Sequence, residues 1–202
     1  MRLFGWLSGL LLFPVTVLAQ IFVYGGANVN TVHSQFLVGA IQPQAGYQLG
    51  VSNHWSISST NSFRPGLAME LNRRGYNQEI DTIRHIYRLT YFTVYPHMNY
   101  LIGKRWSVVA GAEISGLIRA RYRQGLERIG VIENYRGSDI ALRAELRWQF
   151  RPRWGIYAGY THGLRNLIKY PSITDTGDFV GTIRDVNFRT VHVGVLIAAF
   201  NL

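Results

Sequence analysis

Two glutamates, Glu113 and Glu145, are candidates for a catalytic pair of carboxylates. Each lies in a run in which apolar and polar residues alternate, so both carboxylates would share one environment. Two carboxylates held close together can act as a general acid and a general base. Here Arg119, Arg143 and Arg147 lie on the same faces of these runs. Because cationic neighbours favour ordinary ionised carboxylates, the pattern predicts structural ion pairs rather than catalysis.

The sequence gives little indication of a metal or cofactor site. The chain has no cysteine, and its six histidines, His33, His54, His85, His97, His162 and His192, form no metal-binding spacing such as HExxH. Asp175 and Asp178 enclose a Thr-Gly turn that offers two ligands for Ca²⁺ but not the full ligand pattern. We therefore expect no metal and no cofactor.

The formal net charge is +10, from 21 Lys and Arg against 11 Asp and Glu. Such an excess suits nucleic acid, anionic lipid or simple solubility. No basic helix or recognised nucleic-acid module accompanies it, so we expect no nucleic-acid partner.

The N-terminus has the layout of a secretory signal. Met1-Arg2 precedes the apolar run LFGWLSGLLLFPVTVLA, which ends in the small residue Ala19. We predict a signal peptide over residues 1–19 and a mature domain over 20–202. An uncleaved membrane anchor is the alternative, disfavoured by the short run and by Pro14. No later stretch reaches 18 consecutive apolar residues.

The elements that position these side chains are strands, because the hydropathy alternates with a period of two. In WSVVAGAEISGLIRARYR, residues 106–123, the even positions are apolar and the odd ones collect the charge; residues 139–150 repeat the pattern. Segments of this kind predict eight strands, at 21–30, 41–52, 55–71, 84–101, 106–122, 138–150, 154–168 and 185–202. Short connections at 52–54, 102–105 and 151–153 alternate with long ones at 31–40, 72–83, 123–137 and 169–184.

That alternation of connections is typical of bacterial outer-membrane barrels, which have tight periplasmic turns and longer external loops. Trp55, Trp106 and Trp154 each follow a short connection, so they would form part of a periplasmic aromatic girdle. A soluble lipocalin-like barrel also alternates, with its apolar face inside. The export signal, the strand length and the Trp positions favour the membrane. We predict an all-β, eight-stranded antiparallel up-and-down transmembrane barrel in the bacterial outer membrane.

If lipid covers the apolar face, the charged face lines the lumen. Eight strands leave an interior only just wide enough for side chains, so the bore would be filled rather than open. Buried charges persist only when paired, which predicts an ion-pair lattice. Its expected members are Arg64, Glu70, Glu113, Arg119, Arg121, Arg143, Glu145, Arg147, Arg165 and Arg189.

Several stretches resemble the PorT-like outer-membrane β-barrel family. Gly25-Gly26-Ala27-Asn28 is similar to its GGxN first strand, and residues 91–96, YFTVYP, to its YLEIP strand. Residues 110–116, AGAEISG, resemble its AGPYLG segment, and residues 160–166, YTHGLRN, its YxYGLTN motif. Unlike most members, this chain ends on Leu202 rather than an aromatic residue. The resemblance implies insertion by the barrel-assembly machinery and no catalytic residues, and some members are associated with protein secretion.

Arginines at or in the external loops, Arg73, Arg74, Arg123, Arg128 and Arg136, are expected to contact lipopolysaccharide phosphates, which guanidinium groups bind bidentately. We expect a non-enzymatic structural or accessory barrel attached to a secretion or uptake assembly. One alternative is a small porin-like channel. Another is an enzyme that modifies lipid A acyl chains, prompted by His162; however, Leu164 stands where a serine partner would be needed.

Overall fold

The computed structural model describes residues 19–34, 39–56, 62–80, 82–124, 127–130, 135–168, 171–173, 179–182 and 186–201. Every regular element in these ranges is a β-strand, and none of the described residues forms a helix long and apolar enough to cross a membrane. The signal peptide expected over residues 1–19 and the turn with Asp175 and Asp178 lie outside the described residues, apart from Ala19.

Eight long strands make the wall of the molecule. They are β1 Ala19–His33, β2 Ala40–Trp55, β3 Phe63–Ile80, β4 Ile83–Ile102, β5 Trp106–Gln124, β7 Ser138–Arg151, β8 Trp154–Gly163 and β11 Asn187–Asn201. Three short strands supplement them: β6 Glu127–Gly130 pairs with the end of β5, and β9 Pro171–Ile173 pairs with β10 Phe179–Thr182.

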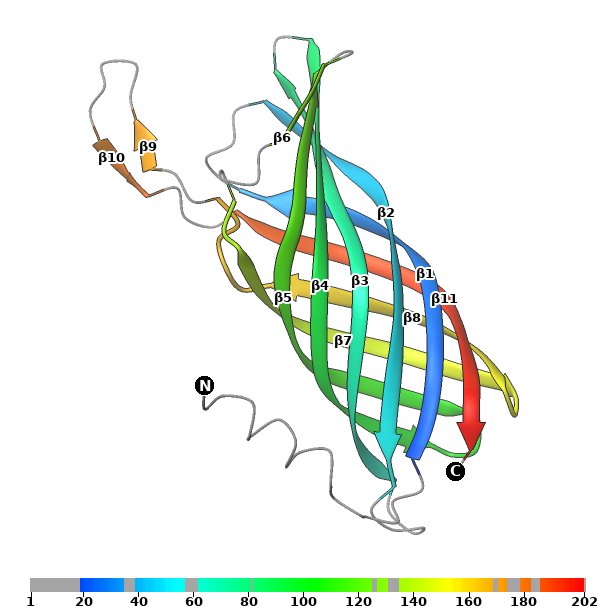
Figure 1. Cartoon of the computed structure of the whole chain (residues 1–202). Helices are drawn as coiled ribbons and strands as arrows, with labels where there is room; N and C mark the ends of the chain where they lie inside the picture. The colour runs from blue at the N-terminus through cyan, green and yellow to red at the C-terminus, as the bar shows by residue number, and fades with distance from the viewer. Residues whose placement is uncertain are drawn as a thin grey trace, which may run out of the picture.

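The sheet closes on itself. The order β4-β3-β2-β1-β11-β8-β7-β5 is joined at its ends by the β4–β5 pairing, and every pair of neighbours is antiparallel. Figure 1 shows the tilted strands wrapping around one axis. The prediction of an eight-stranded antiparallel barrel is confirmed.

Two connections differ from their predicted lengths. Residues 72–83, expected to be a loop, continue β3 and β4 in register to Ile80↔Ile83, and Thr82 has a positive φ of 68° in the turn between them. In Figure 1 this hairpin rises together with the ends of β5 and β6 at the upper end of the barrel. The expected turn at 52–54 instead lies within β2, so Trp55 ends that strand rather than opening the next.

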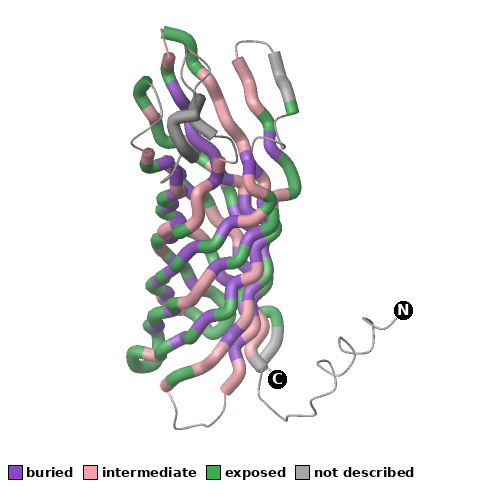
Figure 2. The backbone as a smooth tube through the Cα atoms, turned by 90° about the vertical axis from the view of Figure 1, so that its left-hand side faces the viewer, coloured by how far each residue is buried: buried purple, intermediate pink, exposed green. Residues whose placement is uncertain are grey.

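The two faces of the wall differ in polarity. Burial alternates residue by residue along most strands, as Figure 2 shows. The outward face is largely apolar; on β5 it runs from Trp106 to Ile118. With a rise of about 3.3 Å per residue and a tilt of about 40°, these twelve steps span about 30 Å along the barrel axis, close to the thickness of the hydrocarbon core.

A β-bulge in β5 reverses the alternation near the end of the barrel where β6 lies. This end is opposite the short turns, and we call it the external end. Thr90 pairs with Arg119 but the next residue, Tyr91, pairs with Leu117, so Ile118 is an extra residue. Before the bulge the odd positions of β5 face inward; after it Ala120 is buried and Arg121 is exposed. One inserted residue therefore exchanges the faces of everything that follows it in the strand.

Candidate functional site

The lumen is occupied by an ion-pair lattice centred on Arg143. Its guanidinium group pairs with Glu70 at 3.0 Å and Glu113 at 2.9 Å, and also with Glu145. These side chains come from β3, β5 and β7, so the lattice ties together opposite parts of the wall. All four residues are at most 3% exposed. At this burial, a charged side chain is tolerated only when groups of opposite charge lie beside it, as they do here.

Two further arginines extend the lattice towards the ends of the barrel. Arg74, on the external side, pairs with Glu113 and lies 3.4 Å from Asp139. Arg147, on the periplasmic side, pairs with Glu145 at 2.7 Å. Three guanidinium groups thus face four carboxylates, and the His192 ring nitrogen, 3.4 Å from Glu145, supplies a further polar contact.

Neutral side chains complete the hydrogen bonding of the carboxylates. The Tyr24 hydroxyl donates to Glu70 at 2.8 Å and Asn72 donates to its other oxygen at 3.0 Å. Thr161 donates to Glu113 at 3.2 Å. The Tyr95 ring lies 4.9 Å from the Arg143 guanidinium carbon and covers its face. The lattice is therefore a hydrogen-bonded plug built by side chains from seven of the eight wall strands.

Above the lattice, an apolar cluster fills the external end of the bore; we call it the outer cluster. Tyr76 and Tyr135 share a hydrogen bond of 3.0 Å between their hydroxyls, and Tyr76 stacks on Tyr87. Burial raises the pKa of Tyr135 well above its ordinary value, so its hydroxyl stays protonated. The buried members are Val32, Tyr76, Leu89, Tyr91, Ala120, Tyr135, Leu167, Val186 and Phe188.

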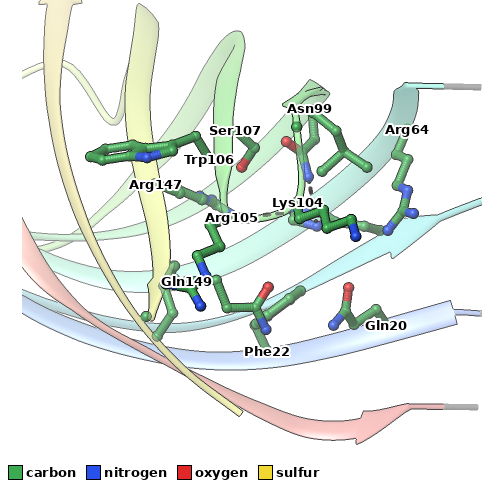
Figure 3. A pocket seen from close by; sticks show the side chains of 15 residues that line it. Gln20, Phe22, Arg64, Asn99, Lys104, Arg105, Trp106, Ser107, Arg147 and Gln149 are labelled. Carbon is green, nitrogen blue, oxygen red and sulfur yellow. Dashed lines mark hydrogen bonds between the residues drawn. The ribbon is translucent and has the colours of Figure 1, made fainter. Parts of the chain in front are cut away.

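Below the lattice, the bore opens into a cavity of about 350 Å³ beside the turn 103–105; we call it the periplasmic vestibule. Figure 3 shows side chains from this turn and from β1, β3 and β7 around one hollow. Arg147 and His54 form its inner end, where Arg147 donates to the His54 Nε2 at 3.1 Å. The cavity therefore ends at the lattice.

The structure places five of the ten expected lumen residues in the buried lattice: Glu70, Glu113, Arg143, Glu145 and Arg147. Arg64 is half-buried and lines the vestibule, and Arg165 is half-buried at the external end, where it donates to the Ser138 hydroxyl. The other three expectations were wrong: Arg119, Arg121 and Arg189 are exposed on the outside. The bulge at Ile118 turns the first two outward, and Arg189 lies between the inward residues Phe188 and Thr190.

The expectation that Arg74 meets lipopolysaccharide was also wrong, because its side chain is 1% exposed and lies inside the barrel. The sequence indicates the inward position of Arg74, because Glu70, Asn72 and Arg74 occupy alternate positions along one strand. The polar stretch Asn72-Arg73-Arg74-Gly75 looks like a loop, which ends the predicted strand too early. Asp139 and Tyr24 were missed as well, each a polar group on an inward position.

Of the other arginines expected to meet lipopolysaccharide, Arg73 lies half-buried on the outer wall with its guanidinium carbon 5.7 Å from the Tyr47 ring centre. Arg123 and Arg136 are half-buried near the external end. Arg128 lies in β6, where the structure describes only the backbone.

Aromatic side chains gather outside the barrel near the short turns. Trp106 and Trp154 are each 44% exposed, and Trp106 stacks on Trp148 with ring centres 5.7 Å apart. The Phe63 and Tyr100 rings also contact each other, with centres 4.7 Å apart and planes tilted by 39°. Trp55 is half-buried at the end of β2.

The described residues hold no group of three or more His, Asp or Glu side chains placed to bind a metal ion. His162 is half-buried near the external end, with the Tyr160 hydroxyl 3.3 Å from its Nδ1. Leu164, the first residue after β8, is exposed and offers no nucleophile. His54 and His97 contact each other edge to face inside the periplasmic half of the bore, where Arg147 donates to His54 and the His97 Nδ1 lies 2.9 Å from the Tyr95 carbonyl oxygen.

A closed eight-stranded barrel with an apolar exterior and a bore filled by paired charges defines an integral outer-membrane β-barrel protein. In agreement, the profile of the family described as outer membrane protein beta-barrel domain matches residues 18–169. The chain belongs to this family, and the predicted location in the bacterial outer membrane is confirmed.

Solved barrels have the same fold. Neisserial surface protein A is 15% identical, with a TM-score of 0.56 over 89% of this chain and 98% of its own. Ail, the attachment invasion locus protein of Yersinia pestis, is 16% identical, with a TM-score of 0.52 over 89% of this chain and 97% of its own. At these identities the likeness concerns the fold alone. No curated protein matches the sequence.

Proposed function

We propose that this protein is a non-enzymatic structural or accessory component of the outer membrane, with a sealed bore. The observation that carries the proposal is the lattice around Arg143, which crosses the lumen from β3 to β7. The outer cluster fills the bore above it. A hydrated path for ions would require these buried pairs to separate, which is costly in a medium that cannot solvate them.

Planar-bilayer recording tests the sealed bore against the porin-like alternative. Purified full-length barrel should give no steady ion current, whereas a porin-like channel gives a stable conductance per molecule. The variant Arg143→Ala removes the lattice centre and serves as a sensitivity control. Steady current through the unaltered protein would overturn the proposal in favour of the channel. Lipid A mass spectrometry with and without the gene tests the enzymatic alternative, for which we expect identical acylation.

We further propose that the partner is a secretion or uptake complex, and that insertion uses the barrel-assembly machinery. Support comes from the resemblance to the PorT-like family and from the ordered strands at the external end, where β3 and β4 continue in register to Ile80 and Ile83. Because β2 and β5 pair with the outer edges of this hairpin, its side chains rather than its strand edges would contact a protein partner. Isolation in mild detergent from the native membrane should recover a larger assembly. Recovery of the barrel alone, with the hairpin fully accessible to protease, would contradict this.

We propose lipopolysaccharide as a second partner. It would bind a set of arginines that we call the outer arginine face, which comprises Arg73, Arg88, Arg119 and Arg121. Arg73 pairs across the sheet with Thr90 and Thr90 with Arg119, while Arg88 pairs directly with Arg121. These positions share the outward face, just above the apolar residues Leu71, Phe92 and Ile118. Like charges directly opposite each other destabilise a sheet, and a shared anion relieves that repulsion.

Lipid A phosphates fit this face because they lie at the same outer boundary of the hydrocarbon and bind guanidinium in a bidentate fashion. Arg119→Gln with Arg121→Gln should reduce the lipopolysaccharide retained by purified barrel several-fold. The matched control is Arg151→Gln with Arg153→Gln at the opposite end, where both residues are exposed. Equal retention by both double variants would remove the outer arginine face as a binding site.

A further inference from the structure

The periplasmic vestibule has a one-sided charge. Four cationic side chains line it, Arg64, Lys104, Arg105 and Arg147, and no Asp or Glu does. Of the four, Arg147 alone forms an ion pair within the described part of the chain, with Glu145. Among the described residues, no carboxylate pairs with Arg64, Lys104 or Arg105 at the mouth of this partly enclosed hollow, where the low-dielectric wall concentrates their positive field.

The side chains are arranged around a common space rather than spread over a surface. Figure 3 shows Arg64 from β3 and Lys104 from the β4–β5 turn directed into the same hollow. Arg64 is half-buried, and its Nε is buried without a hydrogen-bond partner among the described residues. An unsatisfied buried guanidinium N–H is costly, and an acceptor oxygen from a ligand would satisfy it.

A neutral polar group at the same site points to a second ligand feature. Asn99 lines the vestibule, is 4% exposed, and its Oδ1 has no hydrogen-bond partner among the described residues. This oxygen accepts a hydrogen bond, so it suits a hydroxyl of the ligand rather than an anionic oxygen. Phe22, Leu101 and Leu196 supply apolar contacts around the polar groups.

We infer that the vestibule binds a small periplasmic anion that carries carboxylate or phosphate groups together with hydroxyl groups. Its volume of about 350 Å³ lies at the lower end of the range for small-molecule sites, which favours a small solute over a polymer. Because Arg147 and Glu145 close the inner end, the ligand enters and leaves from the periplasm, and the site binds without transporting. This inference does not depend on the partners proposed above.

Isothermal titration calorimetry on the refolded full barrel in zwitterionic detergent tests the site. The probes are citrate, glucose 6-phosphate and pyrophosphate, with glucose as the neutral comparison. We expect saturable one-to-one binding of at least one anionic probe and none of glucose. Arg64→Ala with Lys104→Ala should weaken that binding at least tenfold. The matched control, Arg151→Ala with Arg153→Ala, removes the same charge near the other short turn, outside the vestibule, and should leave the affinity within about twofold.

Two further measurements separate the site from its alternatives. The heat-modifiable gel mobility of each variant reports the folded barrel, and Asn99→Leu tests the hydroxyl contact without changing charge. We expect Asn99→Leu to weaken the hydroxylated probes more than pyrophosphate. Absence of saturable binding of all three anions, or an equal loss in both charge-removing variants, would overturn the inference.

Discussion

Removal of the Glu113 carboxylate is the sharpest perturbation of the lattice. Glu113 is fully buried and is shared by Arg74 and Arg143, with a third hydrogen bond from Thr161 at 3.2 Å. In Glu113→Ala, Arg143 keeps Glu70 and Glu145, while Arg74 keeps only Asp139 at 3.4 Å. Breaking a buried pair while leaving its partner charged typically costs 3–5 kcal/mol. We expect a loss of about 3–5 kcal/mol in the free energy of unfolding.

The assay is reversible urea unfolding of the barrel in phospholipid vesicles, followed by tryptophan fluorescence. The matched control is Glu79→Ala, because Glu79 is an exposed carboxylate on β3 that accepts one hydrogen bond from Gln42. It should change the free energy of unfolding by less than about 0.5 kcal/mol. The two variants thus compare the same chemical change inside and outside the barrel.

A double-mutant cycle then isolates the pair itself. Arg74→Met combined with Glu113→Leu removes both charges and fills the space with apolar groups. Replacement of a buried pair in this way is often neutral, so the double variant should be more stable than the sum of the single losses by about 1–3 kcal/mol. Strict additivity, or a Glu113→Ala loss no larger than that of Glu79→Ala, would refute the reasoning.

Three other predictions follow from the wall and the outer cluster. Leu142→Arg places a charge on the lipid face of β7 and should cost about 2–4 kcal/mol in urea unfolding, whereas Leu142→Phe should be mild. Deletion of Ile118 removes the extra residue of the bulge and leaves Arg119 and Arg121 on the outward face, so urea stability and lipopolysaccharide retention should change little; a large loss of both would contradict the bulge. Tyr135→Phe removes the hydrogen bond to Tyr76 and should cost about 1 kcal/mol by the same unfolding assay, and no measurable loss would mean that water replaces that bond.

The inward direction of the lattice residues could be predicted from the sequence, but their pairing could not. Glu113, Arg143, Glu145 and Arg147 occupy one face of an uninterrupted period-two pattern, so their common inward direction follows from strand geometry alone. Which carboxylate meets which arginine does not follow, because the contacts cross the bore between strands that are not neighbours in the sheet. The pairing of Glu70 with Arg143 is of this kind.

The bulge in β5 and the periplasmic vestibule could not be predicted from the sequence, for physical reasons. Leu117 and Ile118 are both apolar, so hydropathy gives no sign that the strand slips by one residue between them, and Arg119 and Arg121 were assigned to the wrong face. The vestibule depends on how the side chains of the turn 103–105 fold back over the bore. A short turn fixes the hairpin but not the directions of its exposed Lys104 and Arg105.

The most direct test of a lipid-covered wall around a charged bore is spin-label accessibility along β5, which the absence of native cysteine makes simple. Single cysteines at residues 106–121 carry a nitroxide in the vesicle-bound barrel, and collision rates with oxygen and with a water-soluble nickel complex are measured. We predict oxygen maxima at 108, 110 and 114, with the period reversing after Ile118 and nickel access rising at 119 and 121. Oxygen maxima at 109, 113 and 115 instead would contradict the account.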